Sequence, residues 1–295
     1  MIPFREFLPG IRPAVNRRIA ETAGSEADID PGVLPLLLKG KRMRAGLLLY
    51  IHAGLAPAAP PTRQALDLAC AVELAHAASL ILDDMLDGDT ARRGAPSLHL
   101  TRGQGRAVLD AVGILALPYS LAAPYGAGYV TMLASAQRKM ARGVTWEMLG
   151  GPDLPPAELY DTIVARKTGC LFSLAAAWGA MATGEEGAVV TAFGEFGLAA
   201  GKAMQVADDI ADLSAAGAGV RGSRPGSEAL LLRCVPENNG TRQALGRILE
   251  REVSGAAARI AAAGRCRVPP EAWEPFGQAV REIVGLTMGE EVPVG

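Results

Sequence analysis

Two aspartate motifs with identical spacing occur in this chain of 295 residues, Asp83-Asp84-x-x-Asp87 and Asp208-Asp209-x-x-Asp212. In a helix, residues three and four apart share a face, so each motif would bring three carboxylates together. Both motifs end strongly apolar runs, where uncompensated charge is costly. A cation is the natural compensation, and oxygen ligands favour hard ions such as Mg²⁺, which protein carboxylates usually hold together with phosphate oxygens and water. The motifs therefore predict a magnesium site that takes a phosphate-bearing substrate.

Taken alone, one such motif could equally be a solvated helix end, because short motifs have many false positives. The two copies share their spacing and their placement at the end of an apolar run, yet they lie far apart in the chain. This repetition favours two facing carboxylate clusters with metal ions between them.

Cationic residues suited to diphosphate oxygens accompany the motifs. They are Lys41 and Arg44 in Gly40-Lys41-Arg42-Met43-Arg44, the pair Arg92-Arg93, and Lys167, which Thr168 follows. The arginine pair could instead be exposed loop charges, and Lys167 could be a snorkelling lysine. His76 precedes Asp83 by two helical turns, so it could donate to the same cleft or be an ordinary structural histidine.

The segments that must position these residues read as helices, because apolar residues recur at helical spacing and strand-like alternation is missing. We predict an all-α fold, a large helical bundle forming a single domain over residues 1–295. Gly and Pro clusters mark the loops. The predicted helices are 34–55, 62–87, 104–121, 127–149, 156–183, 187–213, 227–235, 239–263 and 270–288.

Composition excludes several classes of function. A formal net charge of -2 without a basic tail argues against nucleic acid as a ligand. Four widely separated cysteines and no secretory signal near the N-terminus favour reduced thiols in the cytoplasm. The uncharged stretch 111–137 is long enough to cross a membrane, but prolines and glycines interrupt it. We expect a buried helical hairpin there and no membrane span.

Together these motifs resemble the trans-prenyl diphosphate synthases over about residues 39–213. The matching pieces are Gly40-Lys41-Arg42-x-Arg44, the segment from Glu73 through His76 to Asp87, Arg92-Arg93-Gly94-x-Pro96-x-x-His99, Lys167-Thr168 and Gln205-x-x-Asp208-Asp209-x-x-Asp212. The resemblance implies an all-α bundle around a deep central cavity, normally in a homodimer, with the two aspartate motifs facing each other across the cavity mouth. It also implies that isopentenyl diphosphate is condensed with an allylic diphosphate after the allylic C–O bond ionises.

The family's chemistry assigns roles to the matching positions. Asp83, Asp84, Asp87, Asp208 and Asp209 would carry Mg²⁺, with Asp212 completing the second motif. Arg92 and Lys167 would grip the allylic diphosphate, while Lys41, Arg44, His76 and Arg93 would hold isopentenyl diphosphate. Thr168 and Gln205 would line the cavity near the reacting carbons. Ala75, Ala78 and Ser79 would form the wall that sets chain length, and their small size favours a product longer than fifteen carbons, with geranylgeranyl diphosphate expected.

The sequence departs from the family pattern after Asp212, where segment 214–226 is short and offers Arg221 and Arg224 in place of two lysines. Val144 also replaces the usual glutamine, and Ala45 the usual proline. Two alternatives therefore stay open: an enzyme of the same fold that cyclises a prenyl diphosphate, and a non-catalytic partner subunit. The residues matched to isopentenyl diphosphate favour chain elongation over the first, and intact aspartate motifs argue against the second.

Overall fold

The computed structural model describes residues 1–26, 28–57, 60–92, 94–217, 240–262 and 273–289. The all-α prediction is confirmed, with one short hairpin as the only strand pair among these residues. The helices are α1 (Phe4–Ser25), α2 (Leu34–Leu37), α3 (Met43–Leu55), α4 (Arg63–Asp87), α5 (Leu98–Arg102), α6 (Gln104–Ala122), α7 (Ala127–Leu149), α8 (Pro156–Val164), α9 (Cys170–Met181), α10 (Gly187–Gly217), α12 (Gly240–Ala262) and α13 (Trp273–Thr287). Two 3₁₀ turns, η1 (Pro31–Val33) and η2 (Ala123–Tyr125), a π-helix, η3 (Ala165–Gly169), and strands β1 (Ala91–Arg92) and β2 (Ala95–Pro96) complete the order. The predicted helix 227–235 and the arginines of segment 214–226 lie outside the described residues, and the single-domain assignment stays a prediction.

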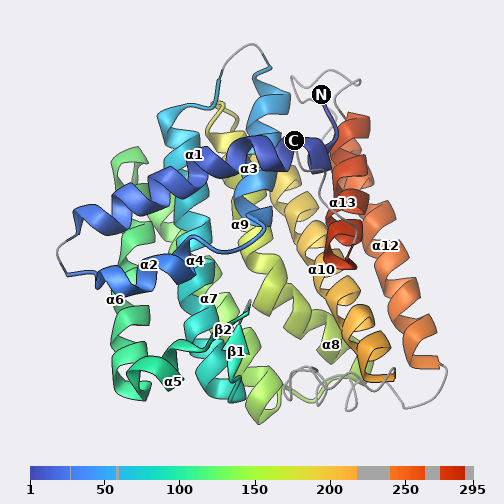
Figure 1. Cartoon of the computed structure of the whole chain (residues 1–295). Helices are drawn as coiled ribbons and strands as arrows, with labels where there is room; N and C mark the ends of the chain where they lie inside the picture. Colours follow the sequence, from blue (N-terminus) through green and yellow to red (C-terminus); the bar gives the residue numbers. More distant parts are fainter. Residues whose placement is uncertain (27, 58–59, 93, 218–239, 263–272, 290–295) are drawn as a thin grey trace.

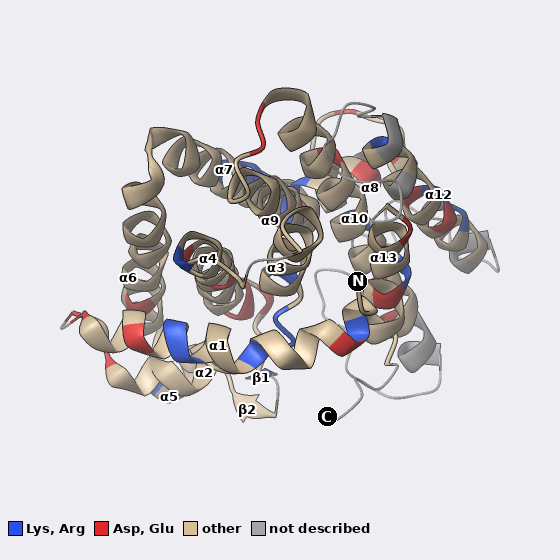
Figure 2. Ribbon diagram, turned by 90° about the horizontal axis from the view of Figure 1, so that it is seen from above, with Lys and Arg blue, Asp and Glu red and all other residues tan. Residues whose placement is uncertain are grey.

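The helices form a bundle, with most of them packed side by side (Figure 1). Viewed from above, α3, α4, α9 and α10 lie at the centre, and α1, α6, α7, α8, α12 and α13 lie around them (Figure 2). Most side chains of α4 and nearly all of α9 are buried, which is what an all-round apolar helix requires. Helix α4, which ends in the first aspartate motif, is thus held by the core, and α10, which carries the second motif, packs against α9 and α12.

Helix α1 is a correction, because no helix is predicted before residue 34. Pro9 and Pro13 lie inside it, and interior prolines usually weaken a helix. Its apolar residues nevertheless recur at helical spacing and are buried, among them Phe4, Val15 and Ile19. Contacts with α3, α4 and α13 therefore stabilise α1 where local propensity alone would not.

The predicted helix 34–55 is also divided, since α2 ends at Leu37 and α3 begins at Met43. Arg42 adopts the left-handed conformation, with φ 61°, which is costly for a residue with a side chain. Its buried guanidinium donates to the carbonyl oxygen of Leu37 at 2.5 Å and pairs with Glu73 at 3.5 Å. Glu73 also accepts a hydrogen bond from the backbone N–H of Ala45 at the start of α3. These contacts hold the turn that carries the first basic motif.

Two described helices are long and apolar enough to cross a membrane by length and composition, α4 and the segment Gln104–Tyr125. The apolar window of α4 is 83% buried inside the bundle, as in the core helix of a globular protein, whereas that of Gln104–Tyr125 is 39% buried. Segment 111–137 does form the expected hairpin, α6 followed by α7, although α6 is less buried than we expected. The absence of a membrane span stays a prediction.

Helices α9 and α10 pack closely because α10 has glycine at the contact. A Cβ atom on Gly197 would lie 2.3 Å from the carbonyl oxygen of Phe172 and 2.6 Å from the Cβ of Ala176. Neither the backbone carbonyl nor the short alanine can move aside easily. This close approach sets the distance between α10 and the segment that carries Lys167.

Gly197→Ala should therefore lower the free energy of unfolding by about 1–3 kcal/mol, because the added methyl group overpacks a helix contact. Gly10→Ala is the matched control, since a Cβ there meets nothing within 4 Å. The control should be neutral or stabilise α1 by about 0.5–1 kcal/mol, as alanine is the better helix former. Urea unfolding followed by circular dichroism measures both variants, and equal midpoints would contradict the packing account.

Candidate active site

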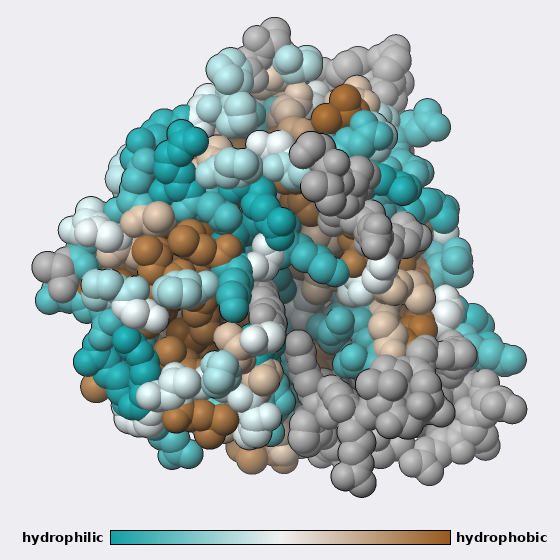
Figure 3. Space-filling model, in the orientation of Figure 1, coloured by the Kyte–Doolittle hydropathy of each residue, from teal (hydrophilic) through white to brown (hydrophobic). Residues whose placement is uncertain are grey.

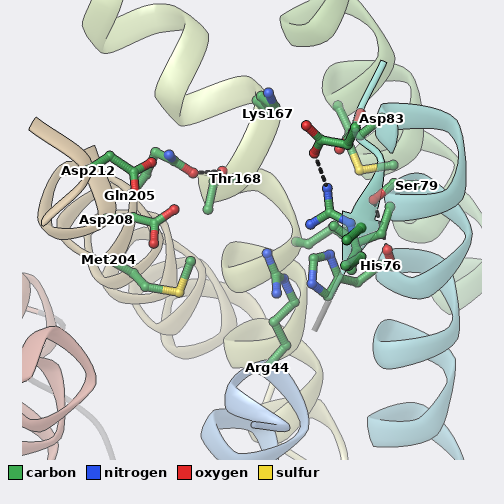
Figure 4. A pocket seen from close by; sticks show the side chains of 16 residues that line it. Arg44, His76, Ser79, Asp83, Lys167, Thr168, Met204, Gln205, Asp208 and Asp212 are labelled. Carbon is green, nitrogen blue, oxygen red and sulfur yellow. Dashed lines mark hydrogen bonds and ion pairs between the residues drawn. The ribbon is translucent and has the colours of Figure 1, made fainter. Parts of the chain in front are cut away.

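A cavity of about 430 Å³ opens between the last turns of α4, the middle of α10 and η3. Most of its lining is polar or charged, an unusual lining for the interior of an apolar bundle. Figure 4 shows Asp83 on one side, Asp208 and Asp212 on the other, and Lys167 and Thr168 between the two sides. The lining residues are Asp83, Asp89, Asp208 and Asp212, then Arg44, Arg92 and Lys167, then His76, Ser79, Thr168 and Gln205, and finally Leu80, Ala91, Met140, Leu171 and Met204.

In the first motif, only Asp83 is among the residues that line this cavity. Asp84 is 2% exposed and forms an ion pair with Arg92, which the hairpin β1–β2 folds back onto the end of α4. Arg92 also contacts Asp89 at 3.1 Å. Asp87 is half-buried at the last turn of α4 and is not among the lining residues.

The second motif repeats this division. Asp208 and Asp212 line the cavity, whereas Asp209 is 3% exposed and turns toward α8. Asp209 accepts hydrogen bonds from the hydroxyl of Tyr160 at 2.5 Å and from the amide of Gln205 at 3.0 Å. Adjacent residues of a helix point about 100° apart, so the second aspartate of each motif must face away from the first.

Burial perturbs the carboxylates that these helices carry. Burial raises the pKa of Asp83 to about 6, although the ammonium of Lys167 opposes the shift. Burial likewise raises the pKa of Asp209 to about 6, against the lowering effect of the hydrogen bonds from Tyr160 and Gln205. The charged form is therefore disfavoured at both positions, and a bound cation would compensate it at Asp83, which lines the cavity.

Lys167 and Thr168 reach the cavity from the π-helix η3, which divides the predicted helix 156–183 into α8 and α9. Short π-helices are common at functional sites. Lys167 forms an ion pair with Glu147 of α7, which is 6% exposed. Burial lowers the pKa of Lys167, but Glu147 and Asp83 outweigh burial and raise it, so the side chain stays an ammonium ion.

Helix α7 approaches η3 closely at Gly143. A Cβ atom there would lie 2.6 Å from the backbone nitrogen of Lys167. The guanidinium of Arg166 stacks over the Trp146 ring at 4.6 Å on the same contact. The position of Lys167 therefore depends on a glycine and a stacked pair that face it from α7.

The residues expected to hold isopentenyl diphosphate are divided between two adjoining cavities. Arg44 and His76 line both, whereas Lys41 lines only the second, which has a volume of about 620 Å³. The ammonium of Lys41 donates to the carbonyl oxygen of Leu286 at 2.5 Å. Arg93 lies outside the described residues. The basic motif thus borders a second polar space beside the first.

The residues expected to form the chain-length wall differ in their surroundings. Ser79 lines the cavity and donates to the carbonyl oxygen of His76 at 2.9 Å. Ala75 and Ala78 are fully buried in the core and are not among the lining residues. Met140 and Leu171 supply apolar surface to the same cavity.

The oxygen donors on the cavity fit Mg²⁺ only in company with a ligand. Among the described residues, no three His, Cys, Asp or Glu side chains lie together so as to hold an ion by themselves. Asp83 faces Asp208 and Asp212 across the cavity (Figure 4). Mg²⁺ commonly uses one or two carboxylates plus phosphate oxygens and water, so a phosphate group between the two sides would complete its ligands.

Three polar residues near the site are absent from the set predicted from sequence. Glu147 pairs with Lys167, Tyr160 donates to Asp209, and Asp89 pairs with Arg92. Only Asp89 had a local signal, since it lies two residues beyond the first motif. Glu147 and Tyr160 reach the site through contacts between helices, which spacing along one helix does not predict.

The model of the polyprenyl synthetase family matches residues 33–220. The chain belongs to the polyprenyl synthetase family. Two solved structures share the polyprenyl synthetase fold. A geranyltranstransferase from Thermotoga maritima has TM-score 0.73 and 23% identity, with coverage of 96% of this chain and 99% of that one. A polyprenyl synthase from Caulobacter crescentus, complexed with calcium and isoprenyl diphosphate, has TM-score 0.67 and 22% identity, with 97% coverage of each chain.

Among polyprenyl synthetases compared by sequence, the geranylgeranyl diphosphate synthase of Pseudescherichia vulneris is 37% identical over 189 residues, which cover 60% of this chain and 61% of that protein. The geranylfarnesyl diphosphate synthase of Aeropyrum pernix is 33% identical over 182 residues, 58% of this chain and 57% of that protein. The chain thus spans about three fifths of the length of these relatives.

In this polyprenyl synthetase, Glu147→Gln should lower the free energy of unfolding by about 1–3 kcal/mol, because it removes the buried charge that compensates the half-buried ammonium ion of Lys167. Glu195→Gln, on the exposed side of α10, is the matched control and should change stability by less than about 0.5 kcal/mol. Thermal unfolding of both variants measures the difference. If the two changed stability equally, Glu147 would not compensate Lys167.

Proposed function

We propose that this chain is a trans-prenyl diphosphate synthase that condenses isopentenyl diphosphate with an allylic diphosphate in the presence of Mg²⁺. The observation that supports the proposal is the opposition of two aspartate motifs across one cavity, which Arg44, Arg92 and Lys167 also line. Two diphosphates carry more negative charge than this site could accept without cations. A second polar space, bordered by Lys41 and Arg44, supports a site for the second diphosphate.

In the proposed reaction, Arg92 and Lys167 bind the allylic diphosphate beside the first motif. Lys41, Arg44, His76 and Arg93 bind isopentenyl diphosphate. The two motifs offer six carboxylates for metal binding, Asp83, Asp84, Asp87, Asp208, Asp209 and Asp212. We infer from the geometry that Asp83, Asp208 and Asp212 contact the ions, while Asp84 and Asp209 act through their neighbours. Bound Mg²⁺ supplies positive charge that stabilises the departing diphosphate.

The remaining steps depend on side chains of the chain itself. Lys167 is held as an ammonium ion by Glu147 and can balance charge that develops on the leaving diphosphate. Thr168 and Gln205 place oxygen atoms on the cavity wall, near the allylic carbons once ionisation begins. Met140, Leu171 and Met204 keep water away from the cation while the double bond of isopentenyl diphosphate attacks it. Loss of a proton then completes the longer chain.

We propose a product longer than fifteen carbons, with geranylgeranyl diphosphate expected. Small residues on α4 support this length, since Ser79 lines the cavity without an aromatic ring to close it. The relatives from Pseudescherichia vulneris and Aeropyrum pernix are named for geranylgeranyl and geranylfarnesyl diphosphate, respectively.

The enzyme is further proposed to work as a cytoplasmic homodimer. Val108, Leu109 and Val112 leave apolar side chains exposed on one face of α6, which a second copy could cover. Apolar side chains also gather on the left of the molecule beside α2 and α6 (Figure 3). Cys70 and Cys170 are free, buried thiols, which accords with a reducing compartment.

The proposal is tested by incubating the purified chain with isopentenyl diphosphate, an allylic diphosphate and Mg²⁺, and by identifying the products by mass spectrometry. We expect a prenyl diphosphate five or more carbons longer than the starter, and its loss on addition of EDTA. Asp208→Asn should lower kcat at least about a hundredfold, because it removes the carboxylate that is proposed to bind Mg²⁺ opposite the first motif. A hydrocarbon formed from the allylic diphosphate alone would identify a cyclase and reject the elongation reaction.

Chain length is tested by Ser79→Phe, which places a ring on the cavity wall one turn before Asp83. We expect a shorter product, because the ring occupies volume that the growing chain needs. Ser254→Phe, on the exposed side of α12, is the control and should leave the products unchanged. An unaltered product distribution in Ser79→Phe would show that the growing chain does not pass this position.

A further inference from the structure

A chain of hydrogen bonds runs from the cavity wall into the interior of the protein. The hydroxyl of Thr168 donates to the side-chain oxygen of Gln205 at 2.7 Å. The amide of Gln205 donates to one oxygen of Asp209 at 3.0 Å, and the hydroxyl of Tyr160 donates to the other oxygen at 2.5 Å. Thr168 and Gln205 line the cavity, whereas Tyr160 is 1% exposed and does not.

Tyr160 and Thr168, the two ends of this series of hydrogen bonds, belong to one continuous segment, because α8 leads directly through η3 into α9. Tyr160 and Thr168 are therefore tied to each other through the backbone and, separately, through Gln205 and Asp209 of α10. Residues 205 and 209 are one helical turn apart, so they present their side chains to the same segment. Lys202, on the same side of α10, adds an ion pair at 2.7 Å to Asp161, the neighbour of Tyr160.

We propose that Tyr160 is a positioning residue of the active site, which acts through Asp209 and Gln205 to orient Thr168 and the second aspartate motif. This inference rests on the proposed function. Both oxygens of Asp209 are engaged, so the carboxylate cannot rotate toward the cavity, and Asp208 and Asp212 remain the residues that face it. The fixed carboxylate also directs the amide of Gln205, whose oxygen must then point to Thr168.

The ring and the hydroxyl of Tyr160 contact different groups, so a single substitution can test the hydroxyl alone. The ring packs in a small apolar cluster with Ile163, Val164, Val206 and Leu245. Tyr160→Phe preserves this packing and removes the hydroxyl that donates to Asp209. The carboxylate would then keep one partner, Gln205, and could turn in its pocket. Disorder would spread to the amide and to Thr168, but not to Lys41, which lies in the loop between α2 and α3.

The decisive experiment is steady-state kinetics of Tyr160→Phe in the full chain. We expect the KM for the allylic diphosphate and the half-saturating Mg²⁺ concentration to rise about tenfold, the effect of a lost hydrogen bond to a charged group. The KM for isopentenyl diphosphate should stay within twofold of the wild-type value. An equal rise in both KM values, or no change in either, would overturn the positioning role.

Two matched variants separate positioning from general loosening. Asp161→Asn weakens the neighbouring contact between α8 and α10 without touching Asp209, and it should not produce the split between the KM values. Tyr129→Phe removes a buried hydroxyl that accepts a hydrogen bond from Gln64, away from the cavity, and should leave both KM values unchanged. If Asp161→Asn gave the same split as Tyr160→Phe, helix anchoring would explain the effect and the role of Tyr160 would be rejected.

Calorimetric titration with Mg²⁺ and inorganic pyrophosphate distinguishes failure of this inference from failure of the proposed function. A wild-type chain that makes no prenyl product would reject the function. The positioning role then depends on whether Tyr160→Phe weakens pyrophosphate binding about tenfold relative to the wild type. Equal affinities of the two proteins would overturn it.

Discussion

Carboxylates that end buried helices must be compensated by hydrogen bonds, opposite charge or a bound cation. In this protein two helices of the core, α4 and α10, carry such carboxylates to one cavity. Different aspartates of these helices are compensated by different partners. Asp84 has the guanidinium of Arg92, and Asp209 has Tyr160 and Gln205. Asp83 is left with the more distant Lys167, and its pKa is raised to about 6 by burial. Asp83, which lines the cavity, therefore relies on a more distant charge than Asp84 does.

The helices around this cavity are packed so that cationic side chains reach it. The π-helix η3 turns Lys167 and Thr168 toward the aspartates, and Gly143 lets α7 approach its backbone. Gly197 brings α10 equally close to α9. Small residues therefore occupy the contacts that set the width of the cavity. A helix bundle with ordinary side chains there would hold its charged residues farther apart.

Much of the site follows from local sequence pattern, because helical periodicity places Asp83, Asp208 and His76 toward one space. The same reasoning recovers α4, α7 and α10, whose apolar faces are long and periodic. It fails for α1, where tertiary packing outweighs two prolines, and at Arg42, whose left-handed backbone is held by contacts with the distant residues Asn16 and Glu73. Spacing also treats the three aspartates of each motif as equivalent. Only the structure shows that Asp84 and Asp209 have buried partners while Asp83 and Asp208 face the cavity.

The central claim is that the two aspartate motifs share metal ions with one diphosphate. A crystal structure of the protein with Mg²⁺ and an unreactive allylic thiolodiphosphate tests it most directly. We predict diphosphate density in the cavity between Lys167 and Arg92, with metal ions that contact Asp83 on one side and Asp208 on the other. A diphosphate bound elsewhere, or bound in this cavity without a metal ion joining the two motifs, would contradict the account.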